Sequence, residues 1–189
     1  MRKVGEETEV GTIVEEKRVF DHPFFPVVSR VVKTPDGTAR DEQLLWDRYG
    51  KKFVIAVVTD EKGRYILVEE PKYGCMKRMI SAPTGAVKKN ESALDAAKRE
   101  LLEETGYEAY GWELLLRDPI VDFADKSDGG EHLIFRGKKA CKVTEPKNSE
   151  QKVLILSSLD LIWEYMRRGR VPAMSMAALF FTHQKYFSM

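Results

Sequence analysis

One segment of 23 residues constrains this chain more than any other part of its sequence. Residues 85–107 read GAVKKNESALDAAKRELLEETGY, in which Gly85 is followed after five residues by Glu91. Seven residues later Arg99 opens the run RELLEETGY, which contains Gly106. The charged residues between these two glycines contain start and stop signals for a helix.

The middle of this segment predicts an α-helix with defined ends. Ser92, with Asp95 three residues later, favours a helix start, and Gly106 favours a helix stop. Small and apolar residues recur every four positions and form a narrow stripe for packing, namely Ala93, Ala97 and Leu101.

Three glutamates crowd the last turn of the predicted helix. Glu100, Glu103 and Glu104 fall at i, i+3 and i+4, so they share one face. Like charges at this spacing repel by roughly 0.2–0.5 kcal/mol per pair, and the helix dipole opposes each by about 0.3–1 kcal/mol. Local rules broken together indicate a functional site. A divalent cation such as Mg²⁺ or Mn²⁺ would turn the repulsion into ligation, whereas the alternative is a solvated acidic helix end.

The full spacing of the segment resembles the Nudix box, the signature of hydrolases that cut nucleoside diphosphates linked to another moiety. Every fixed glycine, glutamate and arginine of that signature is matched, and Tyr107 stands where Leu, Ile or Val is usual. A chance match of seven specified residues is on the order of one in a million. The resemblance implies an α/β fold, a Nudix-type α/β/α sandwich with a mixed sheet in which the box forms loop-helix-loop.

The resemblance also implies roles for the residues of the box. Metal ligands would be Glu100, Glu103 and Glu104, holding one to three Mg²⁺ ions (Mn²⁺ is possible), with the Thr84 carbonyl as a backbone ligand. Gly85 would let the backbone turn closely toward the metal. Arg99 would orient the carboxylates, and Glu91 would be a further ligand or an orienting partner.

A second carboxylate source is expected in the polar loop of residues 144–152. In the resembled enzymes this loop carries a carboxylate into the metal site as ligand or base. Glu150 is the best-placed match and Glu145 is the reserve, while a solvated loop glutamate is the alternative. The base that deprotonates water would be Glu150 or a glutamate of the box.

Two departures from the resembled pattern lie just before the box. In ADP-ribose pyrophosphatase-like proteins this region reads as an Arg-Tyr pair and then Glu-Leu-Pro-Ala-Gly, whereas this chain has Lys72-Tyr73 and then residues 81–85, SAPTG. Lys72 keeps the charge for a substrate phosphate but loses the bidentate fork. Ser81 removes a carboxylate. The alternatives are a surface lysine at Lys72 and half-buried packing for Tyr73.

The remaining pattern predicts an N-terminal antiparallel β element, residues 1–48, followed by a hydrolase domain, residues 49–189. Strands are expected at residues 8–20, 27–33, 38–46, 53–59, 64–70, 107–117, 119–123, 131–135 and 153–156, with a turn at residues 125–130. Helices are expected from residue 157 to about 166 and at residues 174–186. His132 is expected to face solvent from its strand, the alternative being a ligand or base. The β element is too small to bury its own core, and the resemblance implies a homodimer.

Composition limits which kinds of partner and which cellular compartment are expected for this chain. The formal net charge is +1, which gives no support for non-specific nucleic-acid binding. No apolar run approaches the ~20 residues that a membrane span needs, and no signal peptide is visible. The two cysteines, Cys75 and Cys141, fit a reduced cytoplasmic protein better than a disulfide scaffold, although a disulfide between them stays possible.

The sequence therefore predicts Mg²⁺-dependent hydrolysis of a nucleoside diphosphate sugar, with ADP-ribose as the leading substrate. The products would be a nucleoside monophosphate and a sugar phosphate. Other substrates remain open, namely a GDP-sugar, a dinucleoside polyphosphate, a nucleoside triphosphate or a capped RNA end. A non-catalytic domain that senses a nucleotide is the alternative from another class, and the complete set of box glutamates speaks against it.

Overall fold

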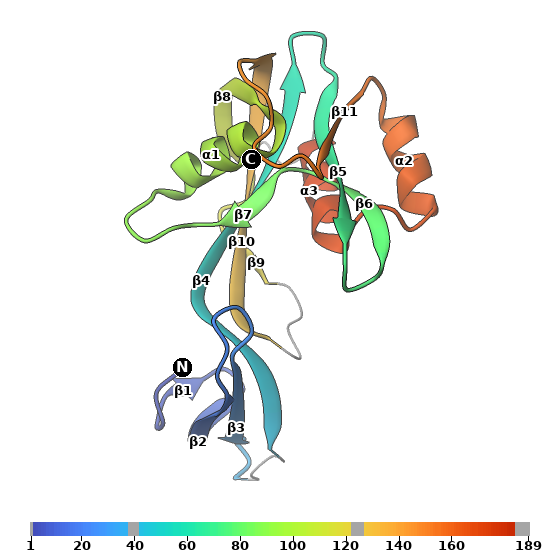
Figure 1. Ribbon diagram of the computed structural model, residues 1–189. Coiled ribbons are helices and arrows are strands. Elements are labelled where there is room, and N and C mark those ends of the chain that lie inside the picture. The colour runs from blue at the N-terminus through green and yellow to red at the C-terminus, as the bar shows by residue number, and fades with distance from the viewer. Residues whose placement is uncertain (1, 38–41, 122–126, 184–189) are drawn as a thin grey trace. The chain divides into compact units, whose positions relative to one another are not determined.

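The computed structural model describes residues 2–37, 42–121 and 127–183, and its helices and strands are shown in Figure 1. The chain forms two compact units, one of residues 1–51 and 121–131 and the other of residues 52–120 and 132–189. The expected division into residues 1–48 and 49–189 stays a prediction. No helix of the described residues is long and apolar enough to span a membrane.

The first unit is built from antiparallel strands, as the alternating β-branched residues predict. It contains β1 (Glu7–Thr8), β2 (Gly11–Phe20), β3 (Val27–Lys33) and the first part of β4 (Gln43–Asp60). Strand β2 pairs with β3, and β3 pairs with β4, both antiparallel. The predicted first strand, residues 8–20, is interrupted by a turn at residues 9 and 10. The start of the predicted strand 38–46 lies outside the described residues.

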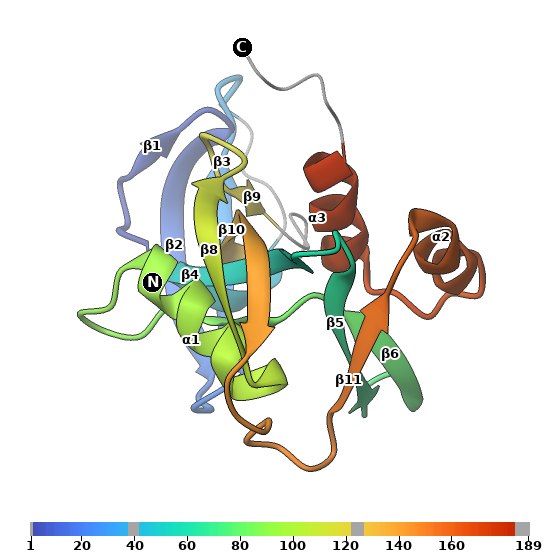
Figure 2. The ribbon, with the colours of Figure 1, turned by 90° about the horizontal axis from the view of Figure 1, so that it is seen from above.

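The second unit is organised around the buried end of β4, where residues 54–58 are fully buried. Successive side chains of a strand point to opposite faces. Val54 and Ala56 pack in the core cluster of α1 (Ala93–Thr105), whereas Ile55 and Val57 pack with α2 (Leu159–Arg167) and α3 (Ala173–His183). Figure 2 shows α1 on one side of β5 and the other two helices on the opposite side. The expected α/β/α sandwich is confirmed.

Further strands complete the sheet. They are β5 (Tyr65–Lys72), β6 (Lys77–Ser81), β7 (Thr84–Ala86), β8 (Tyr107–Leu114), β9 (Ile120–Val121), β10 (Ser127–Lys142) and β11 (Lys152–Leu156). Of these, β9 and β10 also contribute residues to the first unit. Strand β5 pairs antiparallel with β4, β6 and β11, and β7 pairs antiparallel with β4. Residues 127–130, expected in a turn, belong to β10, while residues 122–126 lie outside the described part.

His132 takes a position opposite to that expected. It is buried, and its ring stacks on Phe53 of β4 with ring centroids 5.1 Å apart. Tyr73 is 69% exposed at the β5–β6 turn, which excludes the alternative of half-buried packing. Both Cys75 and Cys141 are free and exposed.

Candidate active site

The helix of the 23-residue segment has the ends that its sequence predicts. Ser92 Oγ accepts a hydrogen bond from the Asp95 backbone N–H at 3.0 Å, which caps the first turn. Gly106 ends α1 with φ 74°, and its N–H donates to the Leu102 carbonyl at 2.9 Å. A Cβ on Gly106 would also overlap the Thr144 carbonyl, so the helix end and the following loop need glycine.

Gly85 brings strand β7 against the glutamate cluster. It pairs with Val54 of the central strand, and a Cβ built on it would overlap the carboxylate of Glu100. Glycine is therefore favoured at this position by a close approach and not by an unusual backbone conformation, because a Cβ would displace the Glu100 carboxylate. The sheet fixes the loop side of the site, and the missing side chain leaves room for Glu100.

Arg99 binds several carboxylates of the segment at once. Its guanidinium donates to Glu91 at 2.7 Å, to Glu100 at 2.5 Å and to Glu103 at 3.3 Å. A further N–H donates to the Ala86 carbonyl at 3.0 Å. Hydrogen bonds from Arg99 lower the pKa of Glu91 to about 2. Arg99 thus joins helix α1 to β7 and holds the acidic side chains in place.

Glu104 differs from its neighbours. The Thr84 backbone N–H donates to its carboxylate at 3.3 Å. Burial, followed by the charges of Glu70 and Glu100, raises the pKa of Glu104 to about 8. A carboxyl group with such a pKa binds a proton near neutral pH unless a cation compensates for the crowding.

Lys147 reaches the same cluster from the polar loop. Its ammonium lies 2.6 Å from a Glu103 carboxylate oxygen, and its backbone N–H donates to the Glu103 carbonyl at 2.8 Å. This contact is the first cause that lowers the pKa of Glu103. The sequence did not predict this role for Lys147. The loop was expected to contribute a carboxylate, and the contact of the loop with α1 is a tertiary contact that residue patterns do not specify.

The candidates before the box and in the loop lie beside each other. The Lys72 ammonium is 2.5 Å from a Glu70 carboxylate oxygen, and the Tyr73 hydroxyl donates to Glu150 at 3.3 Å. Glu150 is exposed, and the reserve candidate Glu145 pairs with Lys142. The roles of Lys72, Tyr73 and Glu150 toward a substrate stay predictions.

Glu70 is the second residue that sequence reasoning missed. It lies on β5 and accepts hydrogen bonds from Ser81 Oγ at 3.5 Å and from Gln151 Nε2 at 3.2 Å. The period of two along a strand was the available signal, because it separates Glu70 from Glu69 onto opposite faces. Only the packing of β5 against α1 tells which face carries the glutamate cluster.

The donor chemistry of the cluster fits a hard divalent cation. Its donors are carboxylate and backbone oxygens, which Mg²⁺ and Mn²⁺ prefer. The close approach at Gly85 and the raised pKa of Glu104 indicate a crowded acidic site. Within residues 2–37, 42–121 and 127–183, no three acidic, histidine or cysteine side chains already surround one point. Arg99 and Lys147 occupy carboxylates instead, so a cation would require these side chains to reorient.

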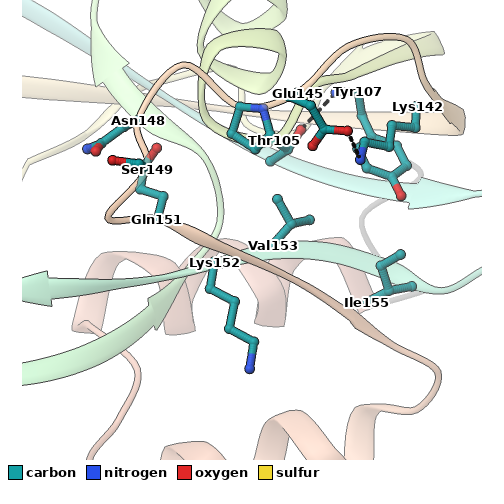
Figure 3. A pocket seen from close by; sticks show the side chains of 11 residues that line it. Thr105, Tyr107, Lys142, Glu145, Asn148, Ser149, Gln151, Lys152, Val153 and Ile155 are labelled. Atoms are coloured by element: carbon teal, nitrogen blue, oxygen red, sulfur yellow. Dashed lines mark hydrogen bonds and ion pairs between the residues drawn. The ribbon is translucent and has the colours of Figure 1, made fainter.

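A cleft of about 680 Å³ opens next to the end of α1, between the polar loop and β11 (Figure 3). Its lining is Thr105, Tyr107, Lys142, Glu145, Pro146, Asn148, Ser149, Gln151, Lys152, Val153 and Ile155. Figure 3 shows Glu145 and Lys142 pointing toward each other at one end of the cleft. Gln151 connects the cleft to the glutamate cluster, because its amide donates to Glu70.

The chain is similar to known proteins in family, sequence and fold. The family model described as "NUDIX domain" matches residues 51–154. A solved structure described as "Crystal structure of ADP compounds hydrolase" superimposes with a TM-score of 0.76 over 94% of both chains at 20% identity. At this identity the superposition is a likeness of fold.

Two curated proteins match part of the chain. A methanol dehydrogenase activator of Bacillus methanolicus is 29% identical over 114 residues, 57% of this chain. An ADP-ribose pyrophosphatase of Bacillus subtilis strain 168 is 30% identical over 101 residues, 53% of this chain. The matches span 59% and 52% of these relatives, so the chain covers little more than half of their lengths.

Proposed function

Because this chain belongs to the Nudix family, we propose that it hydrolyses the diphosphate bond of a nucleoside diphosphate-linked compound. Nucleoside diphosphate sugars are the leading substrates, with ADP-ribose first among them. Water is the only nucleophile that the reaction needs. One P–O bond of the diphosphate breaks, water supplies the new one, and a nucleoside monophosphate and a sugar phosphate leave.

The observation that carries this proposal is the close approach of Glu100 to Gly85, beside Glu103 and Glu104. A solvated acidic helix end would need no glycine in the facing strand. Here strand β7 has Gly85, which has no side chain, at the position where the glutamate cluster contacts the sheet. Burial, together with the charges of Glu70 and Glu100, raises the pKa of Glu104 to about 8, and such shifts are frequent at functional sites.

Several residues of the chain have separate roles in the proposed hydrolysis. Arg99 orients Glu100 and Glu103 through the hydrogen bonds described above. Lys72 offers a cationic group to a substrate phosphate. A carboxylate must accept the proton of the attacking water, and Glu104 and Glu150 are the candidates for that base.

Glu100, Glu103, Glu104 and the Thr84 carbonyl would hold Mg²⁺ or Mn²⁺, which neutralises diphosphate charge and lowers the pKa of bound water. The repulsion between Glu100 and the buried Glu104 supports this part of the proposal. Removal of divalent cations with a chelator should abolish turnover, and added Mg²⁺ should restore it.

A relative's function supports the choice of substrate. The Bacillus subtilis protein that is 30% identical over about half of this chain is an ADP-ribose pyrophosphatase. The test is a screen of ADP-ribose, a GDP-sugar, a dinucleoside polyphosphate and a nucleoside triphosphate with Mg²⁺, following release of AMP, GMP or phosphate. Highest kcat/KM for ADP-ribose supports the proposal. Binding of ADP-ribose without turnover of any compound would favour a sensor domain.

We also propose that the chain forms a homodimer through its first unit and works in the cytoplasm. The unit exposes several large apolar side chains, and such side chains mark an interaction surface where they form a contiguous patch. They are Val4, Val10, Val14, Val19, Phe20, Phe24, Phe25 and Leu44, of which Phe24 is 81% exposed. Light scattering after size exclusion should give twice the mass of 21.7 kDa, and a monomeric mass would contradict the proposal.

A further inference from the structure

Glu70 is outside the box, on strand β5, and it shares with Ile66 the face of the strand that packs against helix α1. Its side chain, 17% exposed, contacts Lys72, Ser81 and Gln151. Ser81, which donates to Glu70, is three residues before Thr84, whose backbone N–H donates to Glu104 at 3.3 Å. Strand β5 and the segment that leads to Gly85 therefore place Glu70 on the side of the sheet where the box glutamates lie.

The register of β5 and β6 explains why Glu70 reaches this position. Ser81 pairs with Val68, and Glu70 pairs with Met79. These four side chains share one face of the sheet, and Glu70 is the diagonal neighbour of Ser81, within reach of a long side chain. Ser81 is the position at which the resembled pyrophosphatases carry a glutamate, and here it donates a hydrogen bond to Glu70 at 3.5 Å.

We propose that Glu70 supplies the carboxylate that Ser81 lacks and is a further member of the carboxylate set that holds the divalent cation. The inference rests on the proposed function only in that the cation serves hydrolysis. The Lys72 ammonium lies 2.5 Å from a Glu70 carboxylate oxygen and neutralises it. A cation must compete with that ammonium, so Lys72 tunes its affinity.

The adjacent residue offers a matched control. Glu69 has a side chain that is 19% exposed, nearly the same as Glu70, but it points to the opposite face. There it pairs with Arg170 at 2.8 Å and lies 3.8 Å from Arg78. Loss of a carboxylate at Glu69 changes the net charge by the same amount without touching the glutamate cluster.

The experiment measures Mn²⁺ binding to the full chain without substrate, by the electron paramagnetic resonance signal of free Mn²⁺. Glu70→Gln should raise the Kd by about tenfold or more, as loss of a supporting ligand does. Glu69→Gln should stay within about twofold of wild type, as expected for a partly exposed ion pair. Equal Kd values for the two variants would overturn the proposal.

Two more variants separate ligation from an indirect effect. Lys72→Met should bind Mn²⁺ at least as tightly as wild type, because a competing ammonium is gone; weaker binding would show that Glu70 acts only by holding Lys72. Glu70→Gln combined with Ser81→Glu should recover most of the lost affinity. A folded double variant as weak as Glu70→Gln would contradict the replacement, and if it does not fold, the Glu70→Gln and Glu69→Gln comparison decides alone.

Failure of the inference is distinguishable from failure of the proposed function. Tight Mn²⁺ binding that depends on Glu70, with no turnover of any diphosphate, would overturn the function and keep the inference. Turnover of ADP-ribose, with a Kd for Mn²⁺ that does not change in Glu70→Gln, would overturn the inference alone.

Discussion

Helices α1 and α2 begin in the same way, with a serine N-cap and an aspartate in the first turn. They end differently. Helix α2 has Arg167 in its last turn, as the helix dipole favours, whereas α1 has no basic residue there. In its place α1 has Glu100, Glu103 and Glu104. Arg99 pairs with Glu100 and Glu103, and the loop residue Lys147 pairs with Glu103. The last turn of α2 has the charge that the helix dipole favours, as expected for a helix that only packs in the fold. The acidic last turn of α1 departs from this rule, and we attribute the departure to the proposed metal site.

The largest expected effect comes from removing single charges at the end of α1. Glu103→Gln and Glu104→Gln should each lower kcat by about two to three orders of magnitude with the fold intact. Glu164→Gln is the control, because Glu164 pairs with Arg168 on the surface of α2 and should leave kcat unchanged. Kinetics on the best substrate of the screen, with circular dichroism for folding, make the comparison. Near-normal turnover of both α1 variants would refute the site.

Next in size is the effect of a methyl group at Gly85. Its Cβ would overlap only the flexible end of Glu100, so Gly85→Ala should fold normally yet lower kcat/KM by about tenfold to a hundredfold. Gly106→Ala should instead mainly lower the stability of the protein. Gly106 has a positive φ, and a Cβ there would overlap the Thr144 backbone. Thermal melts and kinetics of both variants test this split, and an active Gly85→Ala enzyme would contradict the close approach.

A smaller effect concerns pH. The pKa of Glu104 is about 8 in the folded, metal-free protein, against a usual value of 4.5. Because the folded state holds this proton more tightly, the stability it contributes is present below pH 4.5 and is lost as pH rises through about 8. Glu104→Gln removes that loss, so the metal-free variant should be more stable than wild type by on the order of 1–2 kcal/mol at pH 9.

Denaturant unfolding with a chelator at pH 5 and at pH 9 checks this prediction. The difference between Glu104→Gln and wild type should be small at pH 5 and clear at pH 9. A difference that is independent of pH would mean that the carboxyl group is not crowded as described.

The smallest effect is expected at the end of α2. Arg167→Gln removes a favourable charge from the helix C-terminus and should lower the free energy of unfolding by about 0.3–1 kcal/mol. Turnover should not change, because α2 contributes no residue to the glutamate cluster. Denaturant titration and kinetics suffice, and a clear loss of kcat would show that the two helices are not functionally different.

Local sequence signals predicted the parts of the molecule that local physics controls. Ser92 and Gly106 marked the ends of α1, and the apolar run at residues 53–59 marked the buried strand. The crowding of three glutamates was visible from their spacing alone. These features depend on residues close together in the chain.

Contacts between distant segments could not be predicted in the same way. Lys147 reaches Glu103 across 44 positions, and Gln151 reaches Glu70 across 81. The prediction that His132 faces solvent is wrong, because Phe53 from another strand stacks on its ring. Each depends on how strands and loops pack, which residue patterns alone do not specify.

A crystal soaked with Mn²⁺ and measured for anomalous scattering tests the central claim most directly. The account predicts an anomalous peak bounded by the carboxylates of Glu100, Glu103 and Glu104, with Lys147 displaced from Glu103. A peak elsewhere, or no peak while these glutamates keep their contacts to Arg99 and Lys147 at saturating Mn²⁺, would contradict it.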